Sequence, residues 1–141
     1  MIDEMKALLQ AKTMCVLATV SESRPHCSLM AYAAGEDGTE IYLATLRSTR
    51  KFRNVAENPA VSLLVDTREE LPRDRARALT VEGVCRPMAM GTERERARTR
   101  LAAGHPHLRA LLDDPGCEIL SVRVTSFLLL KGISEAHQVD V

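Results

Sequence analysis

Two hydroxyl side chains and two cations stand next to each other where a strand-like segment passes into a short helix. Ser48 and Thr49 precede Arg50 and Lys51, and an apolar run at 41–44 ends shortly before them. The first backbone N–H groups of a helix lack internal acceptors, and the helix dipole favours negative charge there. An arginine can also hold two phosphate oxygens at once. The segment therefore predicts a site for a phosphate group.

The same four residues also suit a purely structural role. Serine and threonine are common helix N-caps, and arginine and lysine are common on solvated helix faces. Helix N-termini are also frequent in proteins, and few of them hold a ligand. The chemistry of the motif by itself leaves both interpretations open.

The elements that must position this motif are short and mostly strand-like. Helical spacing predicts helices at 3–11, 48–57, 92–103 and 106–112, with Thr92 as the cap of the third. Apolar runs and turn residues predict strands at 14–20, 26–34, 40–46, 60–65, 77–88, 117–125 and 127–133. Gly83, inside the fifth of these strands, predicts a bulge or a close approach of another segment.

About seven strands with intervening short helices predict an α+β protein with a mainly antiparallel sheet. Closing the sheet into a barrel would remove its exposed edges. The chain of 141 residues has no repeat or linker, so a single domain over 1–141 is expected.

Composition excludes several classes of partner. Nineteen Lys and Arg residues balance nineteen Asp and Glu residues, and this zero net charge argues against a general nucleic-acid binder or a membrane-surface protein. No apolar run approaches the roughly 20 residues that span a bilayer. The expected partners are therefore a small-molecule substrate or an electron donor, without nucleic acid or membrane.

The cysteines and histidines do not predict a metal site. Cys15, Cys27, Cys85 and Cys117 are far apart and form no Cys-x-x-Cys pair, which predicts buried, reduced thiols in a cytoplasmic protein. His105 and His107 flank Pro106, but two histidines alone do not supply the three or four ligands that a metal site needs.

The phosphate motif and the residues after it resemble the phosphate-binding helix of the pyridoxamine 5'-phosphate oxidase-like family, the FMN-binding split barrels. The family pattern is a strand ending in Thr, then Ser or Thr, Arg-Lys, a helix, and Asn-Pro-x-Val-Ser-Leu. The matching residues, in order, are Thr45, Thr49, Arg50, Lys51, Asn58, Pro59, Val61, Ser62 and Leu63.

This resemblance implies a split β-barrel over about residues 4–132, with FMN as the cofactor. The family strand that runs beneath the flavin is similar to the segment around 25–32. The cofactor-binding residues that the resemblance implies are Cys27, Ser28, Leu29, Met30, Ala44, Thr45, Thr49, Arg50 and Lys51. Strand alternation puts His26, Ser28 and Met30 on one face and Cys27 and Leu29 on the other, and either face could meet the flavin.

The resemblance further implies a homodimer with the flavin in the groove between the subunits. The expected function is a flavin-dependent oxidoreductase acting on a small substrate, with no catalytic side chain assigned because the flavin ring carries out the transfer. The true oxidases carry a C-terminal region rich in Arg and Trp, whereas this chain contains no Trp, so we expect FMN binding without pyridoxamine phosphate oxidation. The alternatives are a non-enzymatic flavin- or haem-binding protein and a deazaflavin-dependent reductase.

Overall fold

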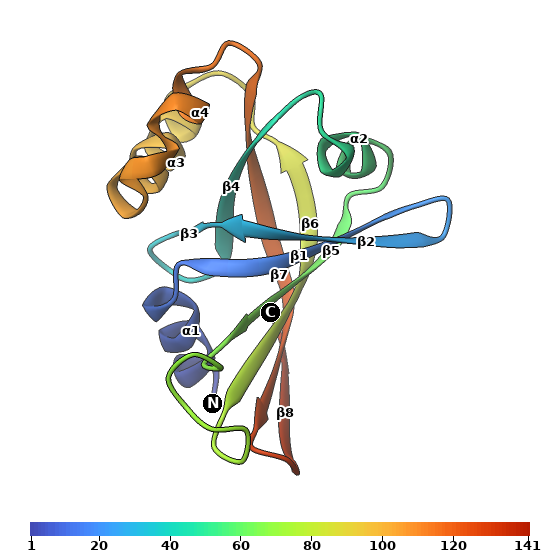
Figure 1. Ribbon diagram of the computed structural model, residues 1–141, viewed down its shortest axis with the longest axis vertical. Coiled ribbons are helices and arrows are strands. Elements are labelled where there is room, and N and C mark those ends of the chain that lie inside the picture. Colours follow the sequence, from blue (N-terminus) through green and yellow to red (C-terminus); the bar gives the residue numbers. More distant parts are fainter.

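The computed structural model describes residues 1–141, built around one curled antiparallel sheet (Figure 1). The strands are β1 (Met14–Ser21), β2 (Arg24–Ala31), β3 (Ala33–Ala34), β4 (Glu40–Leu46), β5 (Ala60–Asp66), β6 (Arg77–Pro87), β7 (Cys117–Lys131) and β8 (Glu135–Asp140). Their order is β2-β1-β5-β6-β7-β4-β3, and β8 also pairs with β7. The expected α+β class and split-barrel architecture are confirmed.

Short helices flank the sheet. They are α1 (Ile2–Ala11), α2 (Arg50–Glu57), α3 (Thr92–Gly104) and α4 (Arg109–Asp113), with a 3₁₀ turn at Pro106–Leu108. Figure 1 shows α2 above the hairpin of β1 and β2, whereas α3 and α4 lie together on the other side of β4. None of the helices combines the length and apolar character that crossing a lipid bilayer requires.

The core follows from strand alternation. Every second residue of β1, β5 and β6 points to the inside of the curled sheet, and Leu17, Leu63 and Val81 are almost completely buried there. Phe127 of β7 fills the same cluster, and α1 closes it from one side with Leu9. This shared apolar interior holds the strands rigidly enough to position side chains at the rim.

The C-terminal part of the sheet differs from the sequence-based expectation. One continuous strand, β7, replaces the two strands expected at 117–125 and 127–133, because Ser126 pairs with Glu82 on one side and Asp140 on the other. The final strand, β8, was not predicted. Its residues are mostly exposed, so they lack the alternation of apolar and polar residues that reveals a half-buried strand.

Two smaller expectations are also wrong. The cap of α3 is Gly91 rather than Thr92, since Gly91 adopts a φ of 148°, which a glycine tolerates and which starts the helix one residue earlier. Cys27 is exposed, because it lies on the outer face of the edge strand β2. The other three thiols are buried, and burial raises the pKa of Cys15 and Cys85 to about 12.

Candidate functional site

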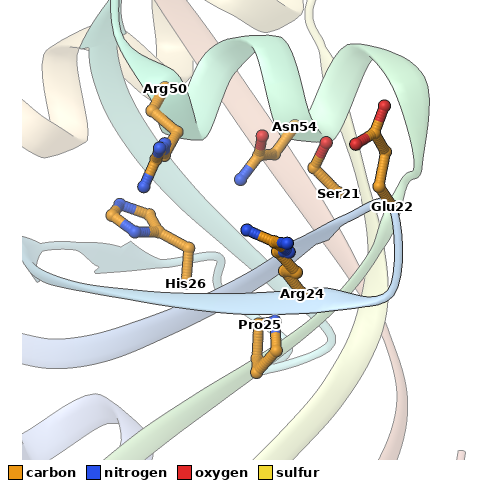
Figure 2. Close-up of a pocket in the computed structure, with 7 residues that line it drawn as sticks. All are labelled: Ser21, Glu22, Arg24, Pro25, His26, Arg50 and Asn54. Carbon is orange, nitrogen blue, oxygen red and sulfur yellow. The ribbon is translucent and has the colours of Figure 1, made fainter.

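A cavity of about 310 Å³ lies between α2 and the hairpin of β1 and β2. Its lining residues are Ser21, Glu22, Arg24, Pro25, His26, Arg50 and Asn54. Figure 2 shows Arg50 from α2 and His26 from β2 pointing toward one another, with Arg24 reaching up between the strand and the helix. The cavity therefore sits at the predicted phosphate motif, and three basic side chains surround it.

The start of α2 is fixed by a threonine whose hydroxyl is fully used. Thr49 is the N-cap, and its Oγ1 accepts a hydrogen bond from the backbone N–H of Phe52 at 3.3 Å. The same hydroxyl donates to the carbonyl of Leu46 at 3.0 Å and lies 2.9 Å from Oγ1 of Thr45. A hydroxyl offers one donor and two acceptor positions, so these contacts occupy all three. These hydrogen bonds fix the backbone between Thr45 at the end of β4 and the first turn of α2.

Asn54 holds α2 against the sheet. Its Nδ2 donates to Oγ1 of Thr19 on β1 at 3.1 Å, and both side chains are buried. Breaking a buried hydrogen bond of this kind is costly, because it leaves a polar group without a hydrogen-bond partner where water cannot replace it. The bond fixes the distance between the helix and the hairpin, and so the width of the cavity.

The arginines of the cavity are electrostatically available. Neither Arg24 nor Arg50 takes part in any ion pair of the molecule. The hydrogen-bond partner of the His26 ring is the hydroxyl of Ser28, at a long 3.5 Å. Two guanidinium groups without carboxylate partners outnumber the one carboxylate that lines the cavity, that of Glu22, so the cavity is locally positive in a protein of zero net charge. An anion is the ligand that such a cavity suits.

Of the expected cofactor-binding residues, Arg50 lines this cavity and its sequence neighbour Lys51 does not. Successive residues of a helix point about 100° apart, so these two adjacent cations leave the helix in different directions. Ser28 shares the inner face of β2 with His26, whereas Leu29 is 72 % exposed on the outer face with Cys27. The side chains of Met30 and Ala44 are buried in the core.

The cavity also contains residues that the sequence did not single out as binding residues. They are Ser21, Glu22, Arg24, Pro25, His26 and Asn54. A signal was present for His26, which the sequence placed on one face of the strand expected at 26–34. Because β2 begins two residues earlier, at Arg24, Arg24 and His26 alternate along one strand and share a face. The register confirms this, with Arg24 opposite Ser21 and His26 opposite Thr19.

An ion-pair network anchors the loop that leads into α2. Arg47 donates to the carbonyl of Pro115 at 2.9 Å and to one carboxylate oxygen of Glu118 on β7. The other carboxylate oxygen of Glu118 accepts from Arg94 of α3 at 3.0 Å. Glu118 therefore joins the loop before α2 to α3 and to the sheet.

The network predicts a pH-dependent stability. Partial burial raises the pKa of Glu118, but the hydrogen bonds from Arg47 and Arg94 outweigh burial and hold the pKa below its ordinary value of 4.5. A carboxyl group with a depressed folded-state pKa stabilises the fold above its unfolded-state pKa, and the benefit disappears as the pH falls through the folded-state value. We expect Glu118→Gln to cost about 1 kcal/mol at neutral pH.

Denaturant unfolding of both proteins from pH 7 to pH 3 measures this effect. The wild type and the Glu118→Gln variant should converge in stability as the pH falls below 4.5. A difference that stays constant over the whole range would show that the charge of Glu118 is not what stabilises the loop.

Comparison with known proteins points to one family. Residues 1–130 match the family model described as pyridoxamine 5'-phosphate oxidase. A search of curated proteins finds no match.

Solved structures share the fold at low sequence identity. A haem-binding protein from Mycobacterium smegmatis superposes with a TM-score of 0.86 at 20% identity, covering 97% of this chain and 56% of its own. General stress protein 26 from Bacillus anthracis has a TM-score of 0.75 at 16% identity, and the match covers 99% of this chain and 98% of that protein. An FAD-binding protein from Mesorhizobium loti has a TM-score of 0.75 at 16% identity, and the match covers 92% of this chain and 91% of that protein.

Proposed function

Because this chain belongs to the pyridoxamine 5'-phosphate oxidase family, we propose that it binds FMN and places the FMN phosphate in the cavity beneath α2. The observation that carries this proposal is the meeting of two unpaired guanidinium groups, Arg24 and Arg50, with the imidazole of His26. A phosphate monoester carries close to two negative charges at neutral pH and offers three acceptor oxygens. It matches the donors that line this cavity.

Each basic residue has a separate role in this proposal. Arg50, in the first turn of α2, can bind phosphate oxygens bidentately, and the backbone N–H groups of Arg50 and Lys51, which have no acceptor within the helix, add donors from above. His26 and Arg24 provide donors from β2 below. Lys51 lies outside the cavity and would contribute only through its longer-range charge.

The flavin ring is proposed to continue from the phosphate along β2. The inner face of this strand carries His26 and then Ser28, so a ligand bound at His26 meets Ser28 next. The backbone of residues 27–30 and of Ala44 and Thr45 would support the ring, as the family resemblance implies. FMN supplies hydride or electron transfer, while the protein supplies position and access, so the proposed activity is a flavin-dependent oxidoreduction of a small substrate.

A second copy of the chain is proposed to complete the site. The outer face of the sheet carries a row of directly paired residues across five strands: Leu29, Val16, Leu64, Thr80 and Leu128. Leu29 is 72 % exposed in the single chain. Four of these five side chains are apolar, and a mostly apolar row across a sheet is typical of a surface that another subunit covers. The row includes a residue of β2, the strand proposed to support the flavin.

The dimer predicts a large effect of a charge at Leu29. We expect the wild type to have twice the monomer mass of 15.6 kDa in light scattering, and Leu29→Glu to shift it to the monomer because the carboxylate would be buried without a partner. Met90→Glu is the matched control, since Met90 is 81 % exposed in the loop before α3. If the Leu29→Glu variant were still a dimer, the interface would not include Leu29.

Mass spectrometry of the cofactor that co-purifies with the protein tests the central proposal. FMN is the expected result, and haem, FAD or a deazaflavin would contradict it. A nicotinamide donor should then bleach the flavin absorbance of the purified protein. Bound FMN that no nicotinamide donor reduces would instead favour a flavin carrier.

A further inference from the structure

The cavity beneath α2 has two ends of opposite charge. In Figure 2, Arg50 and His26 lie at one end, Glu22 lies at the other, and Arg24 stands between them. Glu22 forms no ion pair in the molecule, so its carboxylate is not neutralised by a neighbouring cation. A ligand in this cavity therefore meets attraction at one end and repulsion at the other.

Other groups strengthen the negative end. Glu57, the last residue of α2, accepts a hydrogen bond from the hydroxyl of Ser21 at 3.4 Å and brings a second carboxylate to the hairpin. The C-terminus of a helix also carries the negative end of its dipole. The positive end, in contrast, coincides with the N-terminus of α2 at Arg50.

The hairpin turn holds Glu22 in this place. Glu22 and Ser23 are the two residues between β1 and β2, with φ values of 50° and 65°. Positive φ at both central positions is the backbone of a tight two-residue hairpin turn, which usually contains Gly or Asn. Glu22 and Ser23 would not adopt positive φ by preference. The pairing of Ser21 with Arg24 closes the turn and so fixes the backbone position of Glu22.

We propose that Glu22 makes this site selective for a phosphate monoester over a pyrophosphate; the inference rests on the proposed FMN function. With the flavin ring along β2 toward Ser28, any group attached beyond the phosphate extends the opposite way, toward Arg24 and Glu22. FMN ends at its phosphate and concentrates its charge at the basic end. FAD divides similar charge over two phosphates and places the second one beside the carboxylate of Glu22.

The experiment compares dissociation constants for FAD and FMN, measured by flavin fluorescence on apoprotein. The wild type should prefer FMN. Glu22→Gln keeps the shape and removes the charge, so the ratio of the FAD constant to the FMN constant should fall roughly fivefold, as for one unit charge a few ångströms away at an exposed position. Glu22→Lys should lower the ratio further, and high salt should reduce both effects.

Glu95→Gln is the matched control, because Glu95 is an exposed carboxylate on α3 that also forms no ion pair and does not line this cavity. Its ratio should equal that of the wild type. An unchanged ratio in both Glu22 variants, with FMN binding intact, would overturn the selectivity role and leave the proposed function standing. A wild type that binds neither flavin would refute the proposed function and this inference with it.

Discussion

Arg50→Ala should weaken FMN binding by about 10- to 100-fold, because charge-assisted hydrogen bonds contribute roughly 1.5–3 kcal/mol. Arg50 lines the cavity from the first turn of α2 and has no carboxylate partner that competes for its guanidinium group. The affinity for riboflavin, which lacks the phosphate, should change little. Titration of apoprotein with both ligands measures the two constants directly.

Lys51→Ala is the matched control for Arg50→Ala. It removes the neighbouring cation of the same helix turn, but Lys51 does not line the cavity, so a loss of only a fewfold is expected. Equal losses for FMN and riboflavin in the Arg50 variant would show that Arg50 supports the fold instead of binding phosphate. A Lys51 effect as large as that of Arg50 would show that both cations contact the phosphate.

Gly83→Ala should destabilise the fold by about 1–3 kcal/mol, the usual cost of forcing extra atoms into a packed interior. Gly83 of β6 is buried opposite a bulge of β7, where the register skips Thr125. A Cβ atom there would lie 2.6 Å from the backbone oxygen of Arg123 and 2.6 Å from Cγ1 of Val122. The backbone oxygen cannot rotate away, so the two central strands must separate. Urea unfolding measures the loss.

Gly104→Ala is a control that should change the free energy of unfolding in the opposite direction. Gly104 is the last residue of α3 and does not adopt a positive φ, and a Cβ atom added to it would have no neighbour within 4 Å. Alanine there should stabilise the protein by about 0.4–1 kcal/mol, because it restricts the unfolded chain without creating a clash. A Gly83→Ala variant as stable as the wild type would mean that β6 and β7 can move apart at the bulge.

Much of the architecture was predictable because it depends on local patterns. Alternation along β1, β5 and β6 and helical spacing in α1 and α2 reveal each element within its own residues. A single glycine inside a strand, Gly83, predicted a bulge or a close approach, and the structure shows a close approach of Gly83 to Arg123 opposite a bulge that lies in β7. The family followed from an ordered motif beginning at Thr45, and the family model confirms it.

The candidate site was only partly predictable. Local sequence placed Arg50 at a helix start and His26 on one face of a strand, because both facts depend on residues a few positions away. The tertiary structure was needed to show that these two side chains meet and that Arg24 and Glu22 line the same cavity. The reason is physical: the meeting depends on the curl of the sheet and on the Asn54–Thr19 bond between residues 35 positions apart, and no local pattern encodes such long-range contacts.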